Sequence, residues 1–173
     1  TLEASALIFE IPTGVVADVY SRRISVIIGH ALIGLGFLVW GMFPSFLPIL
    51  LAQVVWGLGY TFTSGATQAW ITDEIGEERA NKAFLAGNRL GLMGALAGML
   101  LAVLVGSFTS AALPIVVSGG GRILLAILLA FIMVEQGFKP VEAEERTTWQ
   151  QMGDTFRKGL RTVRRRPALM AVL

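Results

Sequence analysis

The sequence predicts an all-α protein, a polytopic bundle of helices that crosses a lipid bilayer several times. Of its 173 residues, 54% are hydrophobic and only 15% are charged, and the mean hydropathy is +0.69, which is far more apolar than an ordinary soluble domain. The apolar residues are grouped in long runs, and a membrane-spanning helix needs roughly 20 such residues. The chain contains no cysteine, which excludes disulfides, thiolate metal sites and cysteine nucleophiles.

Five apolar runs are long enough to cross a bilayer. They cover residues 2–20, 24–43, 47–72, 83–108 and 111–134. The breaks at 44–46 and 109–110 are so short that the runs on either side of each must be antiparallel neighbours. Pro48 suits the first turn of the third run, because proline lacks the N–H group that a helix start leaves unpaired.

The positions of the basic residues predict the orientation in the membrane. Lysine and arginine in short loops stay on the cytoplasmic side. The loops at 21–23 and 73–82 and the segment after residue 134 contain such residues, whereas the loops at 44–46 and 109–110 carry no charge. We therefore expect a multi-pass protein of the cell membrane whose charged loops are cytoplasmic.

The chain becomes polar and charged at residues 135–166, which we expect to form a cytoplasmic central loop. Within it, residues 149–163 have apolar side chains at three- and four-residue steps, which predicts an amphipathic helix. Such a helix would lie either on the membrane surface or on the protein's own cytoplasmic face. Residues 167–173 begin a further apolar run. Since the first run is already under way at Thr1, we expect both ends to be cut from a longer protein.

A short signature lies at the turn between the first two runs. Four of its positions match the loop signature of the major facilitator superfamily, namely Gly14, Asp18, Arg22 and Arg23. Val19 and Ser21 stand where that family usually has a basic residue and a glycine. The turn lies on the expected cytoplasmic side, and three more runs and a charged segment follow it. The chain therefore resembles a half of a major facilitator transporter.

This resemblance covers essentially the whole chain and implies its architecture. The five runs would be helices two to six of a twelve- or fourteen-helix protein, followed by the central loop and the start of helix seven. Two related halves would rock about a central site near the midplane of the bilayer. The expected partners are the lipid bilayer, the missing C-terminal half of the same chain and a small-molecule substrate, with protons as a candidate coupling ion. No cofactor, metal ion or nucleic acid is expected.

The resemblance also implies a gate. In the family, the aspartate that matches Asp18 closes the inner side of the transporter against the amino end of a helix in the opposite half. The paired arginines engage acidic groups nearby. Asp73, at the inner end of the third run, is the expected partner of Arg22 or Arg23, and Glu74 is the alternative.

Two other family patterns fit less well. Gln53 stands four residues before Gly57, where the family often has an arginine that is linked to proton coupling. The fourth run contains a ladder of glycines that resembles the antiporter signature in spacing but lacks its Gly-Pro pair. These glycines are Gly87, Gly91, Gly94 and Gly98. Close packing of helix backbones is the favoured interpretation of the ladder.

Charged groups inside a membrane span are costly and therefore tend to have a function. Glu10 lies eight residues before Asp18, about 12 Å deeper along a helix. It could exchange protons, bind a cationic substrate or hold a neighbouring helix by a hydrogen bond. Arg122 lies midway along the fifth run, where an acidic partner, local unwinding at the preceding glycines and a shifted span all stay open. Arg89 is close enough to the surface to extend to the headgroups.

Polar and aromatic side chains follow one another along the third run. They include Gln53, Trp56, Tyr60, Thr63, Ser64, Thr67 and Gln68. Gln53, Trp56 and Tyr60 recur at helical spacing and could form a substrate-binding stripe, or they could be the polar contacts common between membrane helices. His30 is expected to be a packing residue, because no second residue accompanies it at metal-ligand spacing.

The sequence as a whole predicts a secondary active transporter that works by alternating access and exports small amphipathic compounds, with proton coupling as an open option. The alternative is a membrane receptor or scaffold that reuses the transporter fold. A membrane enzyme is disfavoured because no catalytic constellation is visible in the runs. A nucleotide-driven pump is disfavoured because the sequence has no glycine-rich phosphate loop.

Overall fold

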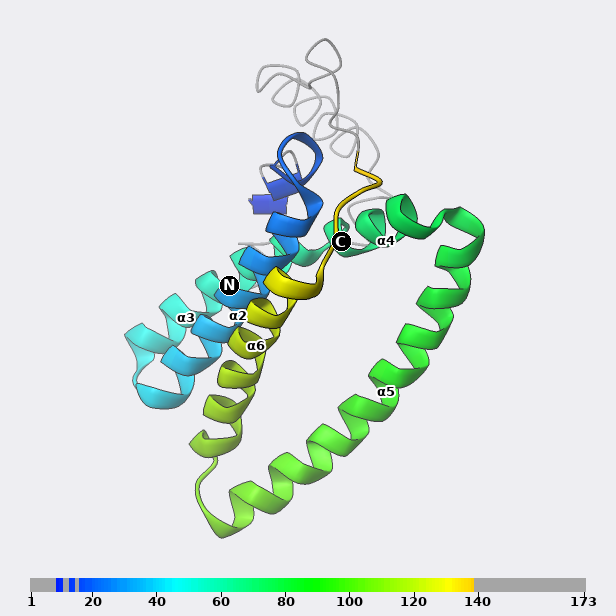
Figure 1. The fold of residues 1–173 in the computed structure, drawn as a ribbon. Coiled ribbons are helices and arrows are strands. Elements are labelled where there is room, and N and C mark those ends of the chain that lie inside the picture. The colour runs from blue at the N-terminus through cyan, green and yellow to red at the C-terminus, as the bar shows by residue number, and fades with distance from the viewer. Residues whose placement is uncertain (1–8, 11–12, 15, 139–173) are drawn as a thin grey trace, which may run out of the picture. The chain divides into compact units, whose positions relative to one another are not determined.

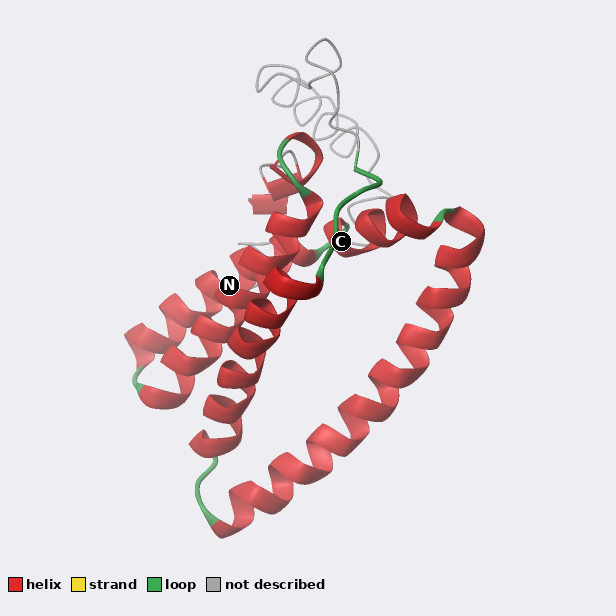
Figure 2. Ribbon diagram, viewed as in Figure 1, coloured by secondary structure: helices red, strands yellow, loops and turns green. Residues whose placement is uncertain are grey.

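The computed structural model describes residues 9–10, 13–14 and 16–138 of the chain. Five helices have defined bounds (Figures 1 and 2): α2 (Arg22–Met42), α3 (Phe46–Thr63), α4 (Ala66–Ile75), α5 (Glu77–Phe108) and α6 (Ala112–Ile132). The described positions from 9 to 19 are helical as well. No strand occurs in the described ranges, and the all-α fold class is confirmed. The amphipathic helix expected at 149–163 and the run at 167–173 lie outside the described residues.

Among the described residues, four helical stretches are long and apolar enough to cross a membrane. They are α2, the α3–α4 stretch Phe46–Ile75, α5 and α6. The first expected run, at residues 2–20, is described only in part. A helix needs about 20 residues to cross the hydrocarbon core, and α2 and α6 have 21 residues each.

Helix α2 packs on α3 through glycines that bring the two backbones together. A Cβ atom added at Gly29 would lie 2.7 Å from the carbonyl oxygen of Gly59, and one at Gly36 would lie 3.0 Å from that of Ala52. Gly29 and Gly36 are seven residues apart and therefore share one face of α2. Small residues allow this close approach, which is a common packing device in membrane proteins.

A second pair of glycines on α2 faces α6. A Cβ atom at Gly34 would lie 2.8 Å from the carbonyl oxygen of Gly119, and one at Gly41 would lie 3.2 Å from the backbone nitrogen of Val116. These two glycines are also seven residues apart, on a different face from the pair that meets α3. Helix α2 thus lies between α3 and α6 and contacts both.

The third apolar run, expected to span the membrane at residues 47–72, lies within the membrane-length stretch Phe46–Ile75, but that stretch is interrupted. Helix α3 ends at Thr63, and α4 begins at Ala66. Ser64 is extended, with ψ 126°, and Gly65 has φ 75°, a conformation that residues with a Cβ atom rarely adopt. The Ser64–Gly65 pair therefore breaks the helix, and α4 continues for ten residues to Ile75.

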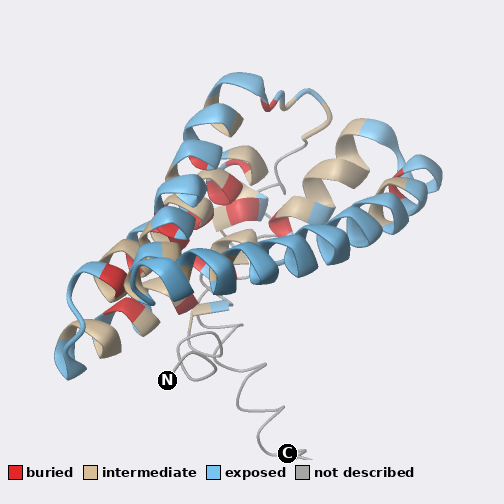
Figure 3. Cartoon of the chain, turned by 90° about the horizontal axis from the view of Figure 1, so that it is seen from below, coloured by how far each residue is buried: buried red, intermediate tan, exposed pale blue. Residues whose placement is uncertain are grey.

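Helix α5 is the longest of the helices with defined bounds, with 32 residues, or about 48 Å. It begins at Glu77, six residues before the apolar run, and Glu77 and Glu78 occupy its first turn, where acidic side chains favour a helix start. Its residues are exposed over nearly the whole length of the helix, as the pale blue ribbon in Figure 3 shows. Buried residues gather instead on α2 and its neighbours.

Candidate functional site

The signature forms a tight turn between two helices. The preceding helical segment ends at Tyr20, whose N–H donates to the carbonyl of Val16 at 3.0 Å. Ser21 is extended and caps α2, because its hydroxyl oxygen accepts from the backbone N–H of Ile24 at 3.0 Å. Serine is a preferred residue for this position. As a result, Asp18 and Arg22 are close together although they lie on opposite sides of the turn.

Arg22 is the centre of the charged end of the bundle, which we define as residues 17–23, 70–77 and 133–138. Its guanidinium forms an ion pair and hydrogen bond with Asp73 of α4, and its Nη2 atom lies 3.8 Å from Oδ1 of Asp18. The guanidinium carbon also lies 5.7 Å from the centre of the Phe138 ring, within the range of a cation–π contact. The side chain of Arg22 is only 19% exposed, so water screens this pairing less than it screens a surface pair.

Arg22 and Asp73, both predicted members of the gate, are therefore brought together in the structure. Arg23 takes a different partner, because its guanidinium donates to the carbonyl of Ala130 near the end of α6. Gly14 lies next to the pair Ala17 and Asp18 in the wall of a cavity that we describe below.

The segment that follows α6, residues 133–138, binds the start of α2 through Glu135. One carboxylate oxygen of Glu135 accepts from the Ser21 hydroxyl at 2.6 Å, and the other accepts from the backbone N–H of Arg23 at 3.0 Å. A helix start has unpaired N–H groups and a partial positive charge. The carboxylate of Glu135 therefore satisfies the first turn of α2 from a position 112 residues away.

The same segment also binds α4. One carboxylate oxygen of Glu74 accepts from the backbone N–H groups of Gln136 and Gly137, both at 2.7 Å. The indole N–H of Trp70 donates to the carbonyl of Val134 at 2.7 Å. A Cβ atom at Gly137 would overlap the carbonyl of Asp73, so the segment passes as close to α4 as a backbone can. From the sequence, Glu74 was expected only as an alternative partner of the arginines, and Glu135 only marked the start of the polar region, so the contacts that these two residues make here were not predicted.

A cavity of about 210 Å³ lies beside Asp18, at the break between α3 and α4. Its walls are formed almost entirely by small residues: Gly14, Ala17, Asp18, Ser64, Gly65, Ala66 and Ala69. The Asp18 side chain is 53% exposed. The Asp18 carboxylate is therefore partly open to solvent beside a surface of small residues.

The candidate substrate stripe of α3 is divided in the structure. The Trp56 ring lies 5.3 Å from that of Phe37 and 6.4 Å from that of Trp40, so it belongs to an aromatic cluster between α2 and α3. Tyr60 is 55% exposed, and Gln53 is half-buried. The hydroxyl of Thr63 donates to the carbonyl of Tyr60 at 2.9 Å within its own helix. Trp56 therefore stabilises the α2–α3 contact, whereas the side chains of Gln53 and Tyr60 stay at least partly exposed.

The other candidate residues lie on three different helical segments. Glu10 is exposed, and its carbonyl accepts from the Thr13 hydroxyl at 3.2 Å. Arg122 is in a regular part of α6, without the local unwinding that the sequence left open. Its Nη1 atom lies 3.2 Å from Nδ1 of His30, and within the described ranges no carboxylate is within ion-pair distance of it. The structure thus pairs His30 with Arg122.

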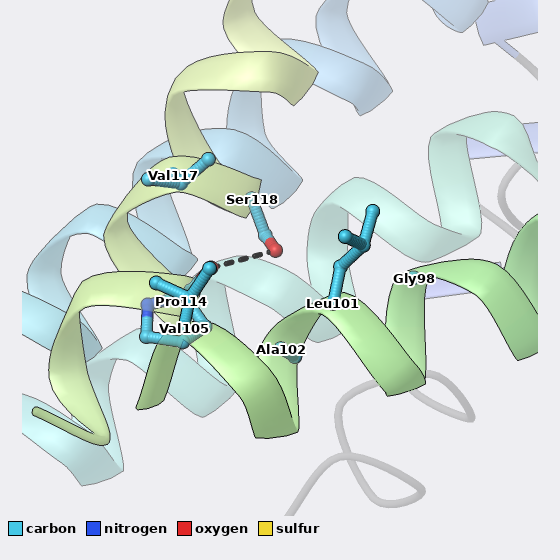
Figure 4. Close-up of a pocket in the computed structure, with 7 residues that line it drawn as sticks. All are labelled: Gly98, Leu101, Ala102, Val105, Pro114, Val117 and Ser118. Atoms are coloured by element: carbon cyan, nitrogen blue, oxygen red, sulfur yellow. Dashed lines mark hydrogen bonds between the residues drawn. The ribbon is translucent and has the colours of Figure 1, made fainter. Parts of the chain in front are cut away.

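A second cavity, of about 240 Å³, lies between α5 and α6 (Figure 4). Its lining consists of Gly98, Leu101, Ala102, Val105, Pro114, Val117 and Ser118. The Ser118 hydroxyl donates to the Pro114 carbonyl at 2.8 Å, and the remaining lining residues are apolar, so the cavity offers a ligand mainly apolar contacts. It is also smaller than the usual ligand pocket of about 300–1,000 Å³. The glycine ladder of α5 meets nothing within 4 Å in the described part of the chain.

Comparison with known proteins agrees with these features. The "Uncharacterized MFS-type transporter YxaM" of Bacillus subtilis (strain 168) is 34% identical over 92 residues, which are 51% of this chain and 22% of that relative. The aligned part thus spans less than a quarter of the relative's length. No solved structure matches the chain. The model of the Major Facilitator Superfamily matches residues 2–173, and the chain therefore belongs to the Major Facilitator Superfamily and is a multi-pass membrane protein.

Proposed function

We propose that this chain is the amino-terminal half of a secondary active transporter that moves small amphipathic molecules across the cell membrane by alternating access. Membership of the Major Facilitator Superfamily supports a transporter rather than an enzyme, and the relative from Bacillus subtilis carries the words "MFS-type transporter" in its name. In this proposal the charged end of the bundle faces the cytoplasm, and a second half of the same chain completes the substrate site.

The observation that carries the proposal is the arrangement around Arg22. This one side chain connects the segment before α2, through Asp18, with α4, through Asp73. The cavity beside Asp18 is lined by small residues and would receive the amino end of a helix from the opposite half. In the closed state the Asp18 carboxylate would interact with that helix end, and in the open state the helix end would leave the cavity.

The substrate would meet the bundle away from this gate. Gln53 and Tyr60 on α3 would supply hydrogen bonds and aromatic surface, and Glu10 would supply a carboxylate. Glu10 and Tyr60 are exposed among the described residues, as side chains that face a central cavity would be in one isolated half. We further propose that the protein exports its substrate and that Glu10 couples this transport to protons.

Transport by the full-length protein in proteoliposomes tests it directly. The probes are a series of fluorescent amphipathic dyes, cationic and neutral, with and without a pH gradient across the vesicle membrane. We expect protein-dependent dye movement that the gradient accelerates. Protein that is folded and inserted but moves no dye faster than empty vesicles would argue against the proposal.

The gate is tested by comparing two arginine variants. Arg22→Gln removes the connection between Asp18 and Asp73. Because loss of a charged hydrogen bond costs about 1.5–3 kcal/mol, we expect this variant to transport about tenfold more slowly, or slower still. Arg79→Gln is the matched control, because Arg79 is exposed in the first turns of α5. Equal transport rates of the two variants would remove Arg22 from the gate.

A further inference from the structure

His30 of α2 and Arg122 of α6 meet in the middle of their helices. The Nη1 atom of Arg122 lies 3.2 Å from Nδ1 of His30, although the residues are 92 positions apart in the sequence. His30 is eight residues from the start of α2, about 12 Å along the helix. Arg122 is ten residues from either end of α6, or about 15 Å. The contact is therefore far from the charged end.

The chemistry of the pair fixes the state of the imidazole. An arginine side chain has five N–H donors and no acceptor. The Nδ1 atom of His30 must therefore be the acceptor, which requires a neutral ring with its proton on Nε2. A protonated imidazole carries N–H groups on both nitrogens, so it cannot accept this hydrogen bond. The contact between α2 and α6 at this level exists only while His30 is neutral.

Within the described part of the chain, the neighbouring elements supply no negative charge that would change this conclusion. Helix α3 has no charged residue. The acidic residues Asp73 and Glu74 of α4 bind Arg22 and residues 136–137 at the charged end. From the segment before α2, Asp18 pairs with Arg22, and Glu10 has no ion pair among the described residues. A proton added to His30 would thus place two cations side by side, which repel each other.

We propose that His30 and Arg122 form a proton-sensitive latch between α2 and α6. Neutral His30 accepts from Arg122 and holds the helices together, and protonation opens the contact. The latch is separate from the proton-coupling role of Glu10 and does not require transport, because it depends only on how two helices pack.

The packing on either side limits where the helices can part. Beyond the latch, Gly34 and Gly119 keep the backbones in contact. Towards the charged end, Arg23 is bonded to the carbonyl of Ala130. The stretch between these two contacts, residues 23–34 of α2 and 119–130 of α6, contains the part that protonation would loosen.

The first test reads the protonation state of His30 in the full-length protein, labelled with 15N-histidine and placed in bilayers. The signal absent from His30→Gln identifies His30, which is the single histidine of these 173 residues. At about pH 8 we expect an unprotonated Nδ1 and a protonated Nε2. A proton on Nδ1 at that pH would overturn the proposal.

The second test measures distances between spin labels as the pH is lowered from about 8 to about 5, the range in which histidine titrates. The chain has no cysteine, so labels go on introduced cysteines, after any cysteines elsewhere in the full-length protein are replaced by serine. Ile28→Cys with Ile127→Cys reports the loosened stretch, and Leu35→Cys with Val117→Cys reports the glycine contact. All four positions are exposed.

We expect the first pair of labels to move apart at low pH and the second pair to stay unchanged. In His30→Gln the amide oxygen can accept from Arg122 at either pH, so the shift should disappear. No shift in the parent protein, or the same shift in His30→Gln, would overturn the proposal. If His30→Gln does not fold, Arg122→Gln replaces it. Removing the second cation should reduce the pH-dependent change in the first label distance by at least about half. An undiminished change would overturn the proposal as well.

Discussion

Replacing Gly119 by alanine is expected to force α2 and α6 apart at their closest point. The new Cβ atom would lie 2.9 Å from both the carbonyl oxygen of Gly34 and the backbone nitrogen of Leu38, whereas ordinary contacts begin at 3.4 Å. The obstacles are backbone atoms, which cannot rotate away as a side chain can. The two helices must therefore separate by about half an ångström, from the distances above. Overpacking of this kind costs about 1–3 kcal/mol.

Gly120→Ala is the matched control for this prediction. Both variants gain the same helix propensity, up to about 1 kcal/mol, but a Cβ atom at Gly120 meets nothing within 4 Å in the described structure. The difference between the two variants isolates the steric cost, so Gly119→Ala should be less stable than Gly120→Ala by about 1–3 kcal/mol.

The measurement is the free energy of unfolding of the full-length protein, titrated from a mild detergent into sodium dodecyl sulfate. Tryptophan fluorescence can follow the transition, because Trp40 and Trp56 belong to the aromatic cluster of α2 and α3. Stabilities of the two variants within about 0.5 kcal/mol of each other, the usual effect of a surface substitution, would show that α2 and α6 do not pack through Gly119.

Three further substitutions test the charged end and the proposed coupling. Asp18→Asn should slow transport about twofold to thirtyfold, because a charge at a helix end is worth about 0.3–2 kcal/mol, while the variant protein still inserts normally into the membrane. Wild-type transport rates in proteoliposomes would count against the gate. Glu10→Gln should abolish the acceleration by a pH gradient and retain substrate binding, and full gradient-driven transport would exclude Glu10 as a proton carrier. Glu135→Gln should lower the free energy of unfolding by about 1.5–3 kcal/mol. The control is Glu78→Gln, at an exposed position at the start of α5. Equal stabilities of the two variants would refute the role of Glu135 at the start of α2.

The sequence could predict the helical architecture because hydropathy over some 20 residues reports directly on burial in lipid. It could also place Asp73 near the paired arginines, because the charges of the loops predict that the ends of these two runs lie on the same side of the membrane. It could not choose between Arg22 and Arg23. That choice depends on how α2 is rotated after the turn at Ser21. The rotation is set by glycine contacts with α3 and α6, such as that of Gly34 with Gly119, which lies 85 residues later in the chain.

Other features were hidden for equally physical reasons. The break at Ser64–Gly65 falls inside an apolar run, and hydropathy does not distinguish a helical glycine from one with φ 75°. Trp56 was grouped with Gln53 and Tyr60 by helical spacing alone, whereas its partner Phe37 comes from another helix. The contact of His30 with Arg122 joins residues 92 positions apart, so neither residue indicates the other in the sequence. Both lie in the middle of an apolar run, however, and a search for polar groups at equal depth in the membrane could have paired them.

The position of α2 between α3 and α6 also sets an order of assembly during synthesis. Helix α3 follows α2 after three residues, so the hairpin closed by Gly29 and Gly59 can form as soon as both helices have left the ribosome. The face of α2 that contacts α6 must wait until α6 has been synthesised. Arg122 lies 92 residues after His30, and translation of 92 residues takes about 5–20 s. During that interval Gly34 and His30 face lipid or the insertion machinery. A cross-link between α2 and α6 should therefore appear only in nascent chains long enough to have released α6, well after the α2–α3 cross-link is complete.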